Sequence, residues 1–394
     1  MPEGVEYLVE GVQVTKANVE KVLQENFGVH AKILEASPLG KDAIGYMSVI
    51  RRLSLQWPTH RDDLPESVII KITSSSSVKD ALDRSGRRSG DPSKAEEEER
   101  IMNFLQACMH NNEVTYLRNF TKFREEADFS YPITHYTGDY GSDNSYIVLK
   151  DYKDCKLIDL IDGFNEEQLY AIVDQIVKIQ AYGFTNSECS LIPIPPERVA
   201  LISGFVNHLL VSARALHDKY PKVFKKLKTF LDHTFTDGVS DMVSQRINYI
   251  NRVGRWSLVH GDLWAPQILW DDDRTIGAIV DWQGTTCGSP VEDILRILTT
   301  CTSVENRRRL TKPLLDYYHR ELTKALAKKD FEIPFTREDI EQELVDFYPC
   351  SLMSCVFANS FWDKAELLSG EGRMDESFSR LAAFIDDVLQ SKGL

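Results

Sequence analysis

The stretch that decides the fold reads Leu258-Val259-His260-Gly261-Asp262-Leu263-Trp264-Ala265-Pro266-Gln267, and Ile279-Val280-Asp281-Trp282 follows it. Between them, the apolar runs 268–270 and 276–280 flank the polar turn 271–275, a pattern that predicts a β-hairpin. Because a hairpin folds back on itself, Gln267 and Asp281 should lie close together, and Asp262 can lie close to both. Phosphoryl transfer from ATP needs such a group: one carboxylate to take a hydroxyl proton and further oxygen atoms to hold magnesium.

Each piece also has a plain structural interpretation. A single His-Gly-Asp is often just a turn, and a single Asp-Trp after a strand is often a strand end with a solvated carboxylate. The order and spacing of the two pieces, with apolar strands around them, favour a functional site over two unrelated turns.

Length and composition set the broad class of protein. A chain of 394 residues can bury a large core and is long enough for two lobes or domains. Its net charge of −14 argues against general binding to nucleic acid or to an anionic membrane. No apolar run is long enough to span a bilayer, and residues 1–6 lack the profile of a signal peptide. The 7 cysteines are scattered and form no Cys-x-x-Cys pair, which predicts free thiols in the reducing cytoplasm.

The predicted elements are rich in strands first and helical afterwards. A helix between Thr15, as N-cap, and Gly28 precedes strands at 31–34, 46–55 and 67–72, a long helix at 96–122 and a strand at 146–149. Beyond residue 150 we expect helices at 166–184, 204–234, 238–252, 290–302, 305–328, 337–368 and 375–390. The sequence therefore predicts an α+β fold with lobes at 1–149 and 150–394, and a ligand cleft between two such lobes.

Two charged residues occupy positions that otherwise belong to the core. Lys71 lies inside the apolar strand 68–72, where its ammonium is costly unless it reaches water or an anion. Glu113 falls on the apolar stripe of the long helix, which steps by three and four through Met102, Leu105, Met109, Leu117 and Phe120. The two explain each other as an ion pair, like the strand lysine and helix glutamate of kinases, whose lysine reaches phosphate oxygens. The acidic run 96–99 offers rival partners, although it lies in a solvated first turn.

The loop ahead of the lysine strand carries Gly40, Gly45 and Ser48. Glycines let a loop approach phosphates closely and leave backbone N–H groups free to bind them. The pattern is neither Gly-x-Gly-x-x-Gly nor a Walker A loop, and an ordinary hairpin loop is the alternative. Its position before Lys71 favours phosphate binding.

These segments together resemble a known family, the choline-kinase-like (CHK, ecdysteroid-kinase-like) branch of the aminoglycoside phosphotransferase superfamily, in particular its nematode-type members. The resemblance covers nearly the whole chain. It rests on Gly40-Lys41, Gly45-Tyr46-Met47-Ser48, Ile70-Lys71, His110-Asn111-Asn112-Glu113-Val114, His260-Gly261-Asp262-Leu263-Trp264, Ile279-Val280-Asp281-Trp282-Gln283, Gly288-Ser289-Pro290 and Glu292-Asp293-Ile294-Leu295-Arg296.

The resemblance implies a bilobal protein-kinase-like fold, with a small antiparallel sheet in the N-lobe and a large, mainly helical C-lobe. It implies ATP- and Mg²⁺-dependent phosphorylation of a hydroxyl group on a small molecule. The resemblance implies that Asp262 is the catalytic base, that His260 orients the catalytic loop and that Asp281 is a magnesium ligand. It also implies that Asp293 ties the segment after the metal site to the catalytic loop.

The resemblance also assigns the nucleotide contacts. Lys71, paired with Glu113, contacts the ATP phosphates, and the backbone around Leu149 and Asp151 binds adenine. The acceptor, a choline-like, sterol-like or xenobiotic alcohol, would bind in the C-lobe. Aromatic candidates for lining its pocket, for each of which core packing is the alternative, are Trp264, Trp282, Phe357, Phe361 and Trp362.

One residue departs from the family pattern. The family usually has Asn five residues after the catalytic Asp, as a second magnesium ligand, and this chain has Gln267 there. Glutamine keeps the amide oxygen but sets it one methylene farther out, while magnesium demands near-ideal octahedral geometry. A nucleotide-binding pseudokinase is therefore the alternative to an active enzyme. A protein kinase ranks lower, because Asp-Phe-Gly, Ala-Pro-Glu and the glycine-rich loop of protein kinases are absent from the sequence.

Overall fold

The computed structural model describes residues 6–9, 12–39, 48–73, 92–190, 209–234, 257–362 and 366–394. The chain forms two compact units, which are called unit 1 (Met1–Lys122 with Tyr131–Asp154) and unit 2 (Phe123–Ser130 with Cys155–Leu394). The assignment of functional domains to 1–149 and 150–394 stays a prediction.

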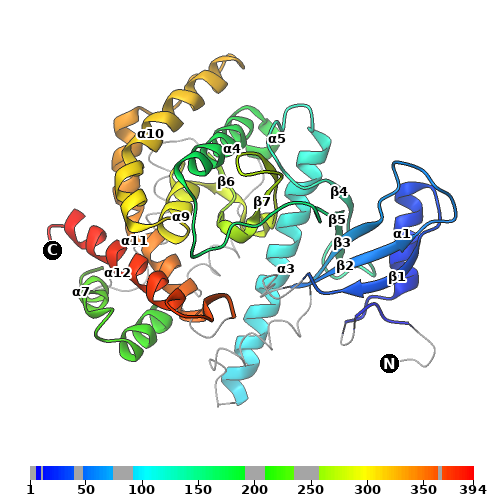
Figure 1. Ribbon diagram of the computed structural model, residues 1–394, viewed down its shortest axis with the longest axis horizontal. Coiled ribbons are helices and arrows are strands. Elements are labelled where there is room, and N and C mark those ends of the chain that lie inside the picture. Colours follow the sequence, from blue (N-terminus) through cyan, green and yellow to red (C-terminus); the bar gives the residue numbers. More distant parts are fainter. Residues whose placement is uncertain are drawn as a thin grey trace. The chain divides into compact units, whose positions relative to one another are not determined.

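Unit 1 is built on a five-stranded antiparallel sheet in the order β1-β2-β3-β5-β4 (Figure 1). Its strands are β1 (Lys32–Ser37), β2 (Ser48–Gln56), β3 (Ser67–Thr73), β4 (Thr134–Thr137) and β5 (Tyr146–Lys150). Successive side chains of a strand point to opposite faces, so the central strand β3 presents Lys71 and Thr73 to one face and Val68, Ile70 and Ile72 to the other.

Helix α1 (Lys16–Phe27) covers the apolar face of this sheet. The hydroxyl of Thr15 accepts the Asn18 N–H at 3.2 Å, and Gly28 ends the helix in the left-handed conformation with φ 70°, which confirms both predicted caps. Apolar side chains of the helix and the sheet form one buried cluster, which includes Val19, Val22, Leu23, Val68, Ile70 and Ile72.

Helix α3 (Pro92–Lys122) is the long helix that the sequence predicts, and it begins four residues earlier than expected. Val114, Leu117 and Phe120 are buried. The part of the apolar stripe from Glu113 to Phe120 is therefore buried, and Glu113 lies within it.

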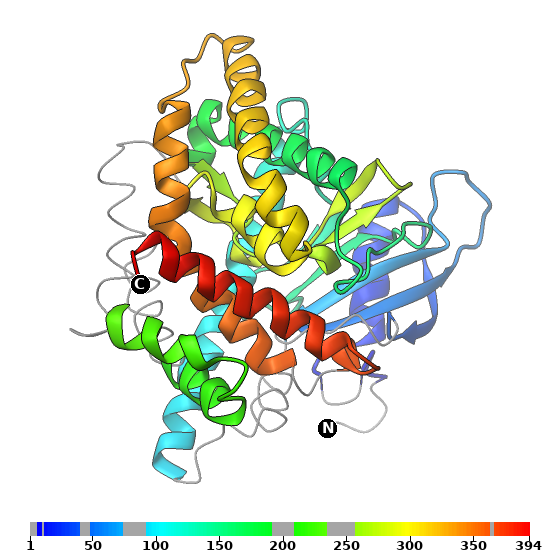
Figure 2. The ribbon, with the colours of Figure 1, turned by 60° about the vertical axis from the view of Figure 1, so that its left-hand side comes forward.

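Unit 2 is mainly helical (Figure 2). Its helices are α4 (Glu166–Thr185), α5 (Ser187–Ser190), a helix at 209–219, α7 (Lys225–Thr234), α9 (Glu292–Thr300), α10 (Val304–Ala327), α11 (Arg337–Trp362) and α12 (Arg373–Ser391). Together with the antiparallel sheet of unit 1, these helices confirm the predicted α+β class.

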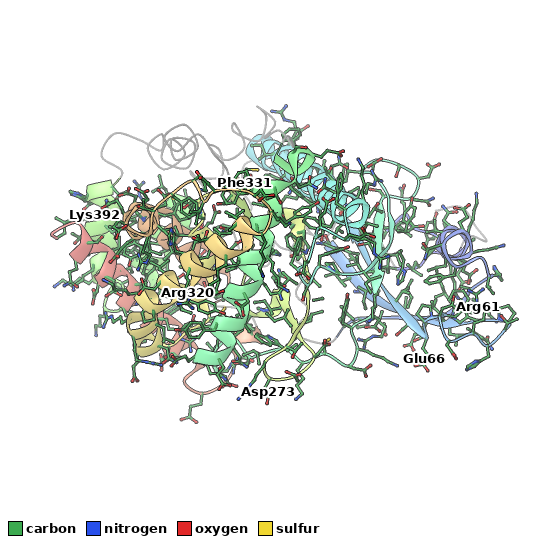
Figure 3. The ribbon with its side chains drawn as sticks, turned by 90° about the horizontal axis from the view of Figure 1, so that it is seen from above. Arg61, Glu66, Asp273, Arg320, Phe331 and Lys392 are labelled. Atoms are coloured by element: carbon green, nitrogen blue, oxygen red, sulfur yellow. The ribbon has the colours of Figure 1, made fainter. Side chains whose placement is uncertain are left out.

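Two small antiparallel sheets lie among these helices. Strand β6 (Ser257–Val259) pairs with β9 (Thr286–Gly288), and β7 (Ile268–Trp270) pairs with β8 (Ile276–Ile279). The second pair is the predicted hairpin. Its turn is exposed, with the Asp273 side chain 84% accessible to solvent (Figure 3).

Two of the predicted helices differ in extent from those in the structure. The expected single helix at 204–234 is interrupted in the structure, where a turn at 220–224 separates the helix at 209–219 from α7. Pro221 explains the break, because proline lacks the N–H that a helix interior needs and its ring clashes with the preceding turn. The predicted helix at 238–252 lies outside the described residues. The predicted helix at 337–368 ends at Trp362, and a 3-10 turn follows at Glu366–Leu368.

Candidate functional site

The predicted ion pair of unit 1 is present. Lys71 Nζ lies 2.5 Å from Glu113 Oε2, and the two side chains are only 9% and 2% exposed. Strand alternation places Lys71 on the face of β3 that α3 covers, and the helical period places Glu113 opposite it. Removing two charges from water is costly, so the pair persists because each side chain neutralises the other.

His110, one helical turn before Glu113, borders this pair. Its Nε2–H donates to the carbonyl of Gly138 at 2.7 Å, and its Nδ1 lies 2.7 Å from the Thr73 hydroxyl. Burial, together with the positive charge of Lys71, lowers the pKa of His110. A neutral ring fits both bonds, because its Nδ1 then accepts the hydrogen of the Thr73 hydroxyl.

The Asp151 carboxylate bonds to two side chains of unit 1. It accepts Arg52 Nε–H at 2.6 Å and Nη2–H at 3.0 Å, and the Ser67 hydroxyl donates to it at 2.6 Å. The carboxylate is 3% exposed and joins the middle of β2 to the start of β3 and the end of β5. Because these bonds engage the side chain, the backbone at Asp151 is what remains for the adenine contact that the resemblance implies.

The remaining nucleotide candidates divide into described and undescribed residues. Leu149 is buried in β5 and pairs with Ile69 of β3. Ser48 is buried at the start of β2, opposite Thr73 and on the same face of the sheet as Lys71. Gly40 and Gly45 lie outside the described residues.

In unit 2, a buried carboxylate fixes the backbone of the loop that follows β6. Asp293 Oδ2 accepts the His260 N–H at 2.7 Å, and its Oδ1 accepts the Gly261 N–H at 3.0 Å. Burial, aided by the neighbouring Glu292 carboxylate, raises the pKa of Asp293 to about 7. Gly261 is required here, since its φ is 83° and a Cβ would lie 2.3 Å from the carbonyl oxygen of Gly284.

The buried ring of His260 joins this loop to the end of the hairpin. Its Nε2–H donates to the Val280 carbonyl at 3.0 Å, and its Nδ1 accepts the Asp262 N–H at 3.4 Å. The ring also packs against Trp282, with centroids 4.9 Å apart. One side chain therefore connects the segments that carry Asp262 and Asp281.

The hairpin brings Gln267 and Asp281 together as predicted. Gln267 Nε2–H donates to Asp281 Oδ2 at 2.8 Å, and Gln283 Nε2 lies 3.4 Å from the same oxygen. Asp281 has φ 67° and ψ 58°, a left-handed conformation that non-glycine residues adopt mainly at strained turns and functional sites.

This pair was tested for its fit to magnesium. Within the described ranges, no group of three or more His, Cys, Asp or Glu side chains could hold a metal ion. Mg²⁺ in nucleotide sites usually binds one or two carboxylates together with phosphates and water, and the Asp281 carboxylate with the Gln267 amide suits that mode. The amide of Gln267 presents its N–H to Asp281, so it must turn before its oxygen can bind a cation.

Sequence reasoning missed the strongest contact of Asp262. Arg296 Nη2 lies 2.9 Å from Asp262 Oδ1, with the arginine side chain 13% exposed and the aspartate 42% exposed. The available signal was an arginine three residues after Asp293, because this spacing places both side chains on one face of helix α9.

The aromatic candidates divide by burial. Trp282 is fully buried and donates its indole N–H to the Ile279 carbonyl at 2.7 Å, so it belongs to the core. Trp264 stacks on Trp362 with ring centroids 5.0 Å apart, and Phe357 packs against the helical core of unit 2. The side chain of Phe361 lies outside the described residues.

The Lys71–Glu113 pair leads to a stability prediction. Glu113→Gln leaves a buried ammonium without its counter-charge and should lower the free energy of unfolding by about 3–5 kcal/mol in urea titration. The matched variant Lys71→Met with Glu113→Leu removes both charges and should stay within about 1 kcal/mol of the parent chain. Equal stability of Glu113→Gln and the parent chain would contradict a neutralising role.

Asp293 leads to a pH prediction. Because its pKa is about 7 in the folded chain and 3.8 ordinarily, the folded chain binds an extra proton between these values. The contribution of this group to the free energy of unfolding therefore falls as pH rises from about 4 to about 7. Subtracting the stability curve of Asp293→Asn from that of the parent chain should reveal this slope, and a rising difference would refute the assignment.

Comparisons with known proteins give the family. The family model DUF1679, described as "Uncharacterized oxidoreductase dhs-27", matches residues 9–392. An uncharacterized kinase-like protein of Caenorhabditis elegans is 25% identical over 348 residues, which are 84% of this chain and 86% of that protein.

Two of the similar solved structures are phosphotransferases. An aminoglycoside 2'-phosphotransferase in complex with GDP has a TM-score of 0.45 at 13% identity, over 94% of this chain and 99% of that one. A macrolide 2'-phosphotransferase of Brachybacterium faecium has a TM-score of 0.41 at 10% identity, over 92% and 97% of the two chains. Because the family model spans nearly the whole sequence, this chain belongs to the DUF1679 family.

Proposed function

We propose that this chain is an ATP- and Mg²⁺-dependent phosphotransferase that phosphorylates a hydroxyl group of a small molecule. The observation that carries the proposal is the link through His260. Its ring bonds to the Val280 carbonyl at 3.0 Å, next to Asp281, and accepts the N–H of Asp262 at 3.4 Å. A base and a metal ligand held by one buried side chain is the arrangement that phosphoryl transfer to a hydroxyl requires.

The residues take these roles in the proposal. The Asp262 carboxylate accepts the hydroxyl proton as the acceptor oxygen attacks the terminal phosphorus, and ADP leaves. Lys71, held by Glu113, contacts the phosphates. Asp281 and Gln267 would hold Mg²⁺, which neutralises charge on the phosphates when bound.

The nucleotide would also use backbone contacts. The backbone at Leu149 and Asp151 would bind adenine, while Gly40, Gly45 and Ser48 would approach the phosphates. Ser48 supports this placement, because it lies across from Thr73 on the face of the sheet that carries Lys71.

Two features favour phosphoryl transfer over the oxidoreductase activity that the family description names. The sequence contains no Gly-x-Gly-x-x-Gly, the fingerprint of dinucleotide-binding sites. The sheets that the described residues form are antiparallel, whereas dinucleotide-binding folds use a mostly parallel sheet. The kinase-like relative from Caenorhabditis elegans agrees with this choice.

We further propose that this chain belongs to the choline-kinase-like branch and that its acceptor is a choline-like, sterol-like or xenobiotic alcohol. We place the activity in the cytoplasm, because the 7 cysteines of the sequence are scattered and form no Cys-x-x-Cys pair.

A helix that crosses a bilayer needs about 20 consecutive, mostly apolar residues, and this requirement applies to the helices of the described ranges. None of them combines the length and apolar character needed to cross a membrane.

A pseudokinase is the second candidate, and the Gln267 contact favours it. An amide N–H on Asp281 Oδ2 at 2.8 Å competes with a cation for the same oxygen. In that case the chain would bind ATP with little dependence on magnesium and would transfer no phosphate.

The role of Asp262 leads to a direct prediction. Asp262→Asn removes the proton acceptor, so turnover of Mg-ATP with a panel of small hydroxyl compounds should fall roughly 10²–10⁴-fold, measured by mass spectrometry of phosphorylated products. The shift in melting temperature caused by Mg-ATP should persist, because the base does not bind the nucleotide. Asp273→Asn, in the exposed hairpin turn, is the control and should keep full activity. Wild-type turnover by Asp262→Asn would eliminate this base.

Gln267→Asn separates the two candidate functions. If the parent site is impaired by glutamine, the shorter asparagine should strengthen magnesium binding and raise turnover at least about tenfold. We expect instead an active parent enzyme whose turnover changes by less than about threefold, because the amide oxygen can turn toward the cation. Magnesium titrations of ATP turnover and of the melting temperature check both outcomes.

A further inference from the structure

Arg296 lies beside the carboxylate that the proposed function uses as its base. Its Nη2 and Nε lie 2.9 Å and 3.1 Å from the same oxygen, Oδ1 of Asp262. Within the described part of the chain, no donor bonds to the other oxygen, Oδ2, and the Asp262 side chain is 42% exposed. The guanidinium therefore holds one oxygen and leaves the other accessible.

Arg296 is itself held in place. Its Nη1 donates to the Thr300 hydroxyl at 3.1 Å, and its central carbon lies 5.8 Å from the centre of the Trp264 ring. With the side chain only 13% exposed, the charge is costly without Asp262 as partner. A planar guanidinium fixed at several points defines the direction of the carboxylate that it binds.

One face of α9 binds both the backbone and a side chain of the loop that follows β6. Asp293 accepts the N–H groups of His260 and Gly261, and Arg296, three residues later, binds the Asp262 carboxylate. Rotation about the last side-chain bond of an aspartate is broad, so a half-exposed Asp262 would otherwise sample many orientations.

We propose that Arg296 is a positioning residue, which orients Asp262 so that Oδ2 takes the proton of the acceptor hydroxyl. This role rests on the proposed function. Proton transfer requires the base within hydrogen-bond reach and in the correct direction, and small misplacements of reacting groups cost large factors in rate.

The test is single-turnover formation of ADP from Mg-ATP with water as the acceptor. Arg296→Met should lower the rate roughly 10- to 100-fold while the KM for ATP stays within about twofold, because the variant misorients the base without touching the nucleotide. Arg296→Lys should recover part of the rate. In an Asp262→Asn background, Arg296→Met should cause no further loss, since it acts through that carboxylate.

Arg307 supplies the matched control. It is a buried arginine of α10, 7% exposed and paired with Asp387, and it contacts none of the proposed site residues. Arg307→Met should lower the melting temperature but leave the rate of the folded fraction unchanged.

Three results would overturn the role of Arg296 alone: a wild-type rate for Arg296→Met, an equal rate loss in Arg307→Met, or a further loss in the Asp262→Asn background. A parent chain that forms no ADP either with water or with the panel of small hydroxyl compounds contradicts the proposed function, and the role of Arg296 falls with it.

Discussion

The candidate site of unit 2 depends on one buried carboxylate. Asp293 binds the N–H groups of His260 and Gly261, and these bonds fix the loop between β6 and the hairpin. An anion in the first turn of α9 is favoured by the dipole of the helix, which offsets part of the cost of burial. The conformation of the loop then determines where Asp262 points.

Two further contacts extend this constraint. The ring of His260 reaches across to the Val280 carbonyl, so the loop and the end of the hairpin are held together. Arg296, on the helix that carries Asp293, fixes the direction of the Asp262 carboxylate. Backbone, ring and guanidinium thus restrict one aspartate and leave one of its oxygens available for chemistry.

In unit 1, too, buried charged groups are held in place by their partners. The sheet and α3 bury Lys71 and Glu113 together, and each is tolerable only because of the other. The neutral His110 beside them adds hydrogen bonds without adding charge. A lysine held in this way keeps a fixed position, which a flexible surface lysine does not.

Part of this organisation could be predicted from the sequence. The hairpin and the Lys71–Glu113 pair follow from periodicity, because a charge on an apolar face demands a partner on a facing element. The caps at Thr15 and Gly28 follow from local chemistry. These features need only neighbours in sequence or the regular period of one element.

Contacts between distant segments could not be predicted in this way. The Asp151 carboxylate binds Arg52 and Ser67, which are both far from it in the sequence. The partner of Arg296 lies in another segment, so no pattern within α9 identifies it. Short strands such as β4 and β9 contain too few residues to show a period. The direction of the Gln267 amide depends on side-chain geometry alone.

The proposed function requires Lys71, Asp262 and Asp281 to act on one magnesium-bound triphosphate. An ATP analogue whose terminal phosphate carries an acyl group tests it, because a lysine amine at the phosphates attacks the acyl carbon, forms an amide and releases ATP. The account predicts that peptide mapping finds the acyl group on Lys71, that excess ATP prevents the labelling, and that Asp281→Ala weakens it in the presence of magnesium. Labelling that bypasses Lys71, or that is indifferent to Asp281, would contradict the account.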